Sequence, residues 1–473
     1  MSAVTTGCGT VPTAHEHRGT QGRLRCAAGR AGAFPLRAMN TQELRATFDA
    51  SLDRLAESDG SRAARRQAMA AFTRRGFPTR RDEDWKYTDL KPILTGRFDP
   101  LPGVPSQDRR RSTLNRLSSL ELAPDAPQLV FLDGRRLANG DSPGLPPGVE
   151  ITDRHTAWQR IHSIQSEGQF REYPLTAINT AFSPDCTLIR VDANVAVAQP
   201  LHVIYLGGAA ANSAEQARLL IDLGTNSRLC VVQHFAARDG GGWTNSVTQA
   251  TQEPGSQLTL YRLQEHTGEH FHTELLDVTL ARDASARLGY VDLGGRLVRN
   301  DLRVRLAEPG ASCDVSGVFL AARGQHVDNH TRIDHIAPRT TSNEAFRGIV
   351  GERGRGVFNG KVVVHAGARG TDARQSSDNL LLSERGEVDT KPELEIYTDD
   401  VKCAHGATVG ELDAEQLFYL RSRGMDEETA RGLLIFAFAH DLLRRIEVPE
   451  LRKRVVTAVA GHLPDYEHWG GLL

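Results

Sequence analysis

With 473 residues, the chain is longer than one hydrophobic core normally serves, so we expect two or three domains. Its 57 Lys and Arg residues nearly balance 59 Asp and Glu residues, which excludes a general electrostatic attraction to nucleic acid or to an anionic membrane. No apolar run approaches the roughly 18 residues of a membrane-spanning helix, so the sequence predicts a soluble protein.

The first 38 residues are rich in Gly, Ala, Thr and Arg, contain Glu16 as their only acid and show no periodicity. An Arg-rich, acid-poor segment is typical of a transit peptide. An overextended start, with Met39 as the true initiator, would have the same features. In either case we expect a disordered extension over residues 1–38.

Residues 39–150 are expected to form an N-terminal helical domain and a linker. Apolar residues recur at helical spacing from Thr41 to Arg75, and Pro78 follows the last of them. The segment Asp82–Leu90 (DEDWKYTDL) places two aromatic residues among charges. We interpret it as an anchor that docks the helices on the core, rather than as an exposed contact surface.

Short β-type runs dominate from about Leu188 to Val409, most of them separated by turns rich in Gly, Asp and Asn. No long helical pattern interrupts them, which argues against a doubly wound α/β sheet. Because the runs are unevenly spaced, the pattern alone leaves a sandwich, a barrel and a parallel β-helix open. The sequence therefore predicts a mainly β protein, with the β core at residues 151–410.

The last segment, residues 411–473, returns to a helical pattern. Gly424 ends a first helix that starts at Asp413, and Asp426 can cap a second helix that runs to about Ile446. The second helix is apolar around much of its circumference, so we expect it to be buried in its own subdomain or against a partner. The large apolar residues that give it this character are Leu433, Leu434, Phe436 and Phe438.

Cysteine usage argues against a metal site closed within this chain. The six thiols form no Cys-x-x-Cys pair, unlike those of a zinc ribbon, a ferredoxin-type cluster or a disulfide framework. A reducing cytosol fits this usage best, so we expect a cytoplasmic protein. Any cluster held here would need ligands from a second chain or would be transient. The six are Cys8, Cys26, Cys186, Cys230, Cys313 and Cys403.

One stretch at the end of the β region combines a thiol with an imidazole. If Val401 to His405 is extended, the side-chain period of two places Cys403 and His405 on one face, with Cα atoms about 7 Å apart. A thiolate and an imidazole at that spacing can bind the same metal or sulfur species. The alternative is that Cys403 is a small buried hydrophobic residue, which is the common role of a free cysteine.

Six segments of the sequence form a distinctive set, which is DEDWKYTDL (82–90), HVDNHTRIDH (326–335), GRGVFNGKVVV (354–364), DTKPELEIYTDDVKCAHGATVG (389–410), LDAEQLFYLRSRGM (412–425) and LLIFAFAHDLL (433–443). Together they closely resemble the SufD family of iron–sulfur cluster assembly proteins. The resemblance runs from about Met39 to the C-terminus and is strongest after Gly324, which favours an overextended start for residues 1–38.

The resemblance implies a right-handed parallel β-helix core flanked by N-terminal and C-terminal helical domains. It implies a non-catalytic scaffold subunit that pairs with its paralogue SufB through the β-helices and contributes to iron acquisition. Its C-terminal helices would bind SufC, an ABC-type ATPase that hydrolyses ATP for the complex. On this basis we expect a chain cut at Gly410 to keep its β core and to lose SufC.

The same resemblance assigns roles to particular residues. By its position in VKCAHGATVG, His405 would face a SufB cysteine at the assembly site, with Cys403 as its neighbour. A transient cluster or iron shared with SufB would be held there, since neutral imidazole suits Fe(II) and thiolate suits iron–sulfur species. The cluster type, the order of iron and sulfur delivery, and flavin binding by the complex stay open.

A different class of function competes with the scaffold. His270 and His272 share a strand face with Glu274 close by, which is the ligand set of a stand-alone cupin-like metal enzyme. Histidines at turns of the β core are the simpler explanation for these residues and for His326, His330 and His335. The run GERGRGVFNGK is not a phosphate-binding loop, because it lacks the required glycine spacing and leads into a strand.

Overall fold

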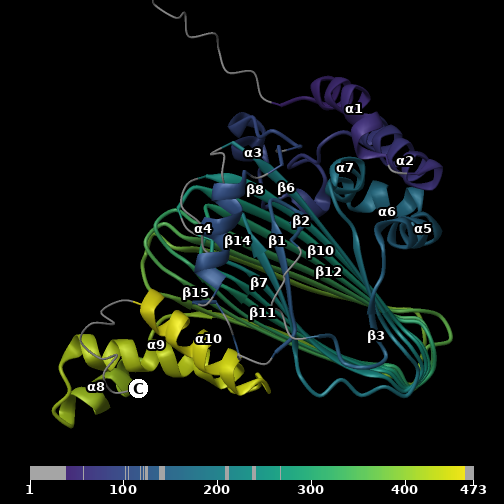
Figure 1. The fold of residues 1–473 in the computed structure, drawn as a ribbon. Coiled ribbons are helices and arrows are strands. Elements are labelled where there is room, and N and C mark those ends of the chain that lie inside the picture. Colours follow the sequence, from purple (N-terminus) through teal and green to yellow (C-terminus); the bar gives the residue numbers. More distant parts are fainter. Residues whose placement is uncertain are drawn as a thin grey trace, which may run out of the picture. The chain divides into compact units, whose positions relative to one another are not determined.

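The computed structural model describes residues 39–463 except 57, 102, 105, 118, 121, 123–125, 138–143, 208–211, 237–240 and 267. The expected extension over residues 1–38 lies outside the described residues. Within them, two sheets wind together as a parallel β-helix of about seven turns, and helices precede and follow it along the chain (Figure 1). This confirms the mainly β class and the β-helix that the family resemblance implied.

Each turn of the β-helix gives one strand to each sheet, and neighbouring strands are parallel. Sheet one contains β5 (Leu201–Leu206), β7 (Arg228–Phe235), β9 (Gln257–Gln264), β11 (Ser285–Asp292), β13 (Ser312–Ala321), β15 (Thr341–Val350), β17 (Asp372–Leu381) and β19 (Lys402–Gly410). Sheet two contains β4 (Thr187–Val191), β6 (Ala214–Leu223), β8 (Gly242–Gln252), β10 (His270–Leu280), β12 (Leu297–Leu306), β14 (His326–His335), β16 (Arg355–Val364) and β18 (Glu387–Ile396).

Three short strands complete the sheets at the N-terminal end. In sheet one, β1 (Gln128–Leu132) is parallel to β5 and antiparallel to β2 (Arg135–Arg136). In sheet two, β3 (Val149–Ile151) is antiparallel to β4. The β-helix therefore begins before residue 151, where the sequence pattern had placed its start.

Most strands are covered on both faces. On β12, Val298 and Leu302 pack inside the β-helix, whereas Leu297 points outward and packs against the N-terminal helices. A strand that is buried on both faces loses a clear alternation of apolar and polar residues. This is why the sequence pattern alone left other all-β folds open.

Most of the helices that precede β4 lie over the outer face of sheet two, whereas Leu117, at the end of the helix 107–117, packs against Val130 and Ile204 of sheet one. Three of these helices lie at 154–182, within the range expected to be β core, because Asp153 and Ser166 cap new helices there. Helix α7 is buried along its whole length between α2 and sheet two. These helices are α1 (Thr41–Leu55), α2 (Asp59–Arg75), η1 (Glu83–Trp85), α3 (Lys91–Gly96), α4 (Gln107–Leu117), α5 (Arg154–Ile164), α6 (Glu167–Glu172) and α7 (Pro174–Phe182).

The segment Asp82–Leu90 docks the N-terminal region on the β-helix, which confirms its interpretation as an anchor. Trp85 is buried, and the guanidinium of Arg299 on β12 lies 4.4 Å from its ring centroid. Lys391 on β18 forms an ion pair with Glu83 at 2.8 Å. The first helical region is thus tied to the last turn of the β-helix.

Three helices follow the β-helix: α8 (Ala414–Ser422), α9 (Glu427–Leu443) and α10 (Pro449–His462), drawn in yellow-green to yellow in Figure 1. Asp413 and Asp426 cap the first two, and Gly424 has the positive φ of 93° expected of a glycine after a helix end. In the part of the chain that the structure describes, no helix has the length and apolar character needed to span a membrane.

Candidate functional site

The C-terminal end of the β-helix is open. Strands β18 and β19 are the last strands of their sheets, so within the described residues each has one edge without a partner strand. All residues of β18 and β19 are at least partly exposed, whereas β16 and β17, one turn earlier, contain buried residues. Unpaired edges of this kind can bind a further strand, which makes this last turn a natural place for association.

Cys403 and His405 lie on the inner face of this open turn. In the parallel register, Cys403 stands over Ala373 and His405 stands over Gln375, and both of these β17 residues are buried inside the β-helix. Cys403 is half-buried against the core, whereas His405 is exposed. The structure therefore brings the two predicted ligands to one face, as the strand period indicated, with only His405 freely accessible.

The protonation of the thiol follows from its surroundings. Burial raises the pKa of Cys403, and the nearby carboxylate of Asp372 raises it further, while a backbone hydrogen bond from Ala373 opposes both. The free thiol is therefore protonated near neutral pH and becomes a strong ligand only when a metal or another cation displaces its proton.

Apolar side chains are exposed around the same end. Tyr397 is 62% exposed just after β18, and Val409 near the end of β19 is 45% exposed. Ile396 at the end of β18 is also exposed. Exposed apolar groups next to unpaired strand edges are typical of a protein–protein contact surface.

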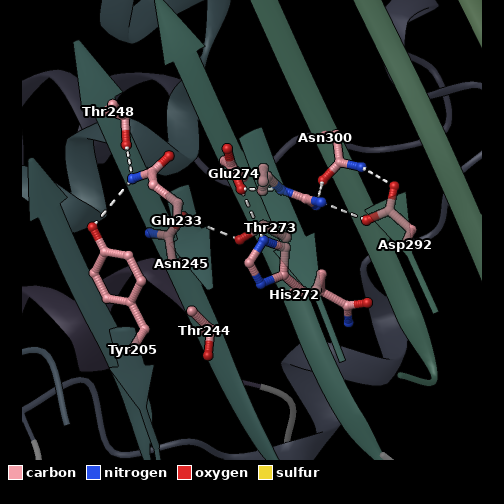
Figure 2. Close-up of polar contacts among 12 residues, drawn as sticks. Tyr205, Gln233, Thr244, Asn245, Thr248, His272, Thr273, Glu274, Asp292 and Asn300 are labelled. Carbon is pink, nitrogen blue, oxygen red and sulfur yellow. Dashed lines mark hydrogen bonds and ion pairs between the residues drawn. The ribbon is translucent and has the colours of Figure 1, made fainter. Parts of the chain in front are cut away.

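The rival histidine cluster lies inside the β-helix (Figure 2). His272 and Glu274 point inward from β10, and the two side chains are 3.1 Å apart. The Glu274 carboxylate is also bound by Arg262 at 2.5 Å, and Arg262 reaches Asp292 at 2.6 Å. Asn300 completes the network by accepting from Arg262 and donating to Asp292.

This buried network does not have the properties of a metal centre. Burial and the charge of Arg262 hold the pKa of His272 well below its usual range, and Arg262 already neutralises the carboxylate. Among the described residues, no group of three or more His, Cys, Asp or Glu side chains is arranged to hold a metal ion. The described geometry therefore lends no support to the cupin-like alternative.

The other singled-out histidines have structural partners. His326 bonds to Thr88 at 2.7 Å, and His335 bonds to Thr340 and Ser342, both at 2.8 Å. The ring of His330 lies 3.1 Å from the carboxylate of Asp328. These contacts match the part of the simpler explanation that gives the histidines polar partners in the β core, but all three lie on strand β14 and not at turns.

The apolar helix α9 packs on the chain's own β-helix. Phe436 is buried against the outer face of sheet one, and Leu433 and Phe438 are half-buried at the edge of the same cluster. Arg347 on β15 binds the Phe438 carbonyl at 2.5 Å and forms an ion pair with Asp441 at 2.8 Å. Leu434 is half-buried and lines a groove of about 270 Å³ with Val409.

This packing changes two expectations. Helices α9 and α10 cover apolar residues of sheet one, among them Leu320 and Ile349, so a cut at Gly410 would uncover part of the core rather than leave it intact. The accessible apolar surface lies instead on α8, which has no buried residue. Phe418 is 74% exposed and Tyr419 is 55% exposed. Sequence reasoning missed them, although the run LFYL gives α8 apolar residues on more than one side.

Comparison with known proteins agrees with this architecture. The family model "SUF system FeS cluster assembly, SufBD core domain" matches residues 205–438, and the model "SufBD protein N-terminal region" matches residues 40–100. The iron–sulfur cluster assembly protein SufD of Escherichia coli K12 is 30% identical over 87% of this chain and 95% of its own length. The chain belongs to the SufBD family of iron–sulfur cluster assembly proteins.

Two other relatives show how widely the family matches this chain. The iron–sulfur cluster assembly SufBD family protein slr0076 of Synechocystis is 30% identical over 81% of this chain and 87% of its own length. Protein ABCI7, chloroplastic, of Arabidopsis thaliana is 29% identical over 82% of this chain and 83% of its own length. The matches span the helical N-terminal region and the β-helix alike.

Proposed function

We propose that the chain is the non-catalytic SufD-type subunit of a scaffold complex in which nascent iron–sulfur clusters are assembled. The observation that carries the proposal is the open last turn, where unpaired strand edges lie beside an exposed His405 and a half-buried Cys403. In this arrangement the paralogue SufB pairs with β18 and β19 and closes the turn. The four cysteines that the structure describes are free thiols, in keeping with a reducing cytosol.

The iron and the cluster are cargo in this proposal. His405 supplies an imidazole for ferrous iron, and Cys403 supplies a thiolate once its proton is displaced. Two ligands on one strand cannot complete a four-coordinate site, so the rest must come from outside this chain. Clusters need sulfur ligands, and we therefore assign a cysteine of SufB to the opposite side of the site.

The ATPase SufC binds the C-terminal helices in this proposal. The contact surface is α8, with Phe418 and Tyr419 as anchors, together with the groove lined by Leu434 and Phe438. Exposed aromatic residues with few rotatable bonds are frequent energetic centres of interfaces. The buried Phe436 would act indirectly, by fixing α9 on the β-helix.

Coexpression of the chain with SufB and SufC tests the proposal. We expect the three chains to copurify, and iron and acid-labile sulfide to be found on the complex but not on this chain alone. A chain that purifies alone, metal-loaded and catalytically active, would contradict it.

A further inference from the structure

One row of inward-facing side chains in sheet one changes from apolar to polar residues toward the open end. The parallel register aligns inward positions of successive strands, so one side chain per turn lies in a row inside the β-helix. The first four positions are apolar and the last three are polar. In chain order they are Val231, Leu260, Leu288, Val315, Glu344, Gln375 and His405.

The two polar residues beneath His405 are bonded to each other. The amide nitrogen Nε2 of Gln375 donates to Oε2 of Glu344 at 2.6 Å, and both side chains are at least 96% buried. Within the described part of the chain, the amide oxygen Oε1 of Gln375 has no hydrogen-bond partner. A buried acceptor without a donor is destabilising, so this oxygen is available to a donor from the next turn.

The opposite sheet holds the amide in place. A methyl group on Gly360 of β16 would come within 2.3 Å of the Gln375 amide nitrogen, so the side chain crosses the interior and lies against this glycine. Gly360 belongs to the GRGVFNGKVVV segment that carries part of the family resemblance. The absence of a side chain there leaves the space that the Gln375 amide occupies.

We propose that Glu344 and Gln375 are positioning residues for His405, with Gln375 Oε1 accepting the N–H of the His405 ring. Neighbouring strands lie roughly 4.8 Å apart, which brings the ring within reach of the amide one turn below. The inference rests on the proposed role of His405 in iron binding. It adds the two buried residues that orient the ring.

The chemistry follows from the two ring nitrogens. A neutral imidazole has one N–H donor and one lone pair, and the hydrogen bond of the N–H decides which nitrogen is free. The Gln375 amide nitrogen donates to Glu344 and lies against Gly360, so we assign the amide oxygen to His405. That bond leaves the other ring nitrogen free to bind ferrous iron. Burial raises the pKa of Glu344 to about 7, but either form keeps an oxygen that accepts from Gln375.

Three single variants and one double variant, called the swap, test the proposed chain of hydrogen bonds from Glu344 through Gln375 to His405, which we call the relay. Glu344→Gln lets the Gln375 amide turn over, because a second amide can donate as well as accept. Gln375→Leu removes the acceptor, and Gly360→Ala displaces the amide without changing any charge. The double variant Glu344→Gln with Gln375→Glu restores an amide–carboxylate pair, again with one oxygen free for His405.

Ferrous iron is added anaerobically to the full chain assembled with SufB. We expect each single variant to bind iron roughly 10- to 100-fold more weakly than the wild type, as is usual for partners that orient a metal-binding histidine. We expect the swap to recover most of the loss. Arg374→Ala, an exposed neighbour of Gln375 on β17, is the control and should bind like the wild type.

A metal-free measurement separates positioning from binding. Nitrogen-15 shifts of the His405 ring in the full chain, assigned with His405→Ala, should show one tautomer in the wild type and in the swap. They should show a mixture in Gln375→Leu. One unchanged tautomer in every variant would overturn the relay.

The outcomes distinguish a failure of the relay from a failure of the proposed iron-binding role of His405. If His405→Ala loses iron while the three single variants keep wild-type affinity, the relay is wrong and the proposed role of His405 stands. If His405→Ala binds iron like the wild type, the proposed role of His405 fails and the relay fails with it.

Discussion

The closed middle of the β-helix and its open end both contain polar side chains that face the interior, but those in the middle are buried and bonded to one another and those at the end are exposed or half-buried. In the middle, Arg262 is fully buried and is bound by Glu274, Asp292 and Asn300. These three partners are labelled in Figure 2. At the open end, His405 is exposed and Cys403 is half-buried, on a strand with a free edge. Both sets face the interior of the same solenoid.

The difference shows how burial decides the role of a polar group here. In the middle set, the charge of Arg262 is balanced by the carboxylates that it binds, and burial holds the pKa of His272 low. These groups therefore stabilise and specify the packing of the turns. In the proposed function, a second chain completes the end set. Substitutions of the buried middle set should therefore change stability, whereas substitutions of the exposed His405 and the half-buried Cys403 should change assembly chemistry and leave stability intact.

The largest expected effect on stability is at Arg262. Arg262→Met leaves two buried carboxylates without their cation, and breaking a buried ion pair in this way lowers the free energy of unfolding by about 3–5 kcal/mol. Chemical denaturation of the full chain measures it. Arg323→Met is the control, because the Arg323 side chain is 86% exposed and should contribute less than about 0.5 kcal/mol. Equal stability of the two variants would contradict a structural role for the cluster.

The next effect is the pH dependence due to Glu344. Burial raises its pKa from an ordinary 4.5 to about 7, so the folded chain prefers the protonated acid. Its contribution to stability is complete below pH 4.5 and is lost as the pH rises to about 7, by about 3 kcal/mol. Cys313, which also lies nearby, stays protonated over this range because burial raises its pKa well above its ordinary value.

The pH effect is isolated by comparison with Glu344→Gln, which has no such titration. Unfolding free energies of the two proteins, measured from pH 4 to 8, should differ by a pH-dependent amount that changes between pH 4.5 and 7. Parallel curves would mean that Glu344 keeps its ordinary pKa in the folded chain.

A smaller effect on stability is expected on α8. Phe418→Ala with Tyr419→Ala removes exposed side chains, so we expect a change in unfolding free energy below about 0.5 kcal/mol. Affinity for SufC should fall by at least about 30-fold, which corresponds to about 2 kcal/mol. Binding measured by calorimetry checks this.

A matched variant on the other surface sharpens the result. Tyr397→Ala removes an exposed aromatic residue beside the open turn. We expect it to weaken pairing with SufB and to leave SufC binding unchanged. If Tyr397→Ala instead weakens SufC binding and the α8 double variant weakens pairing with SufB, the two surfaces are assigned to the wrong partners.

Local patterns in the sequence predicted the features that depend on neighbouring residues. The period of a strand placed Cys403 and His405 on one face, and the capping residues Asp413 and Asp426 predicted where α8 and α9 begin. The anchoring role of Trp85 followed from an aromatic residue set among charges.

Features that depend on distant residues were beyond local patterns. The Arg262 cluster and the pairing of His405 with Gln375 arise from the register between strands of different turns, which no short window contains. The apolar face of α9 predicted burial but not its partner, and the structure shows that the partner is sheet one of the same chain. The helices at 154–182 were not predicted, although their capping residues Asp153 and Ser166 are local signals of a helix start.

The central claim is that the open turn presents His405 to cargo that a second chain helps to hold. His405→Ala tests it most directly, in the complex coexpressed with SufB and SufC, by measuring cluster formation alongside thermal stability and complex assembly. We expect stability within about 0.5 kcal/mol of the wild type, normal assembly and loss of cluster formation, with a milder loss in Cys403→Ser. Cluster formation at the wild-type rate, or unfolding of the variant chain, would contradict the account.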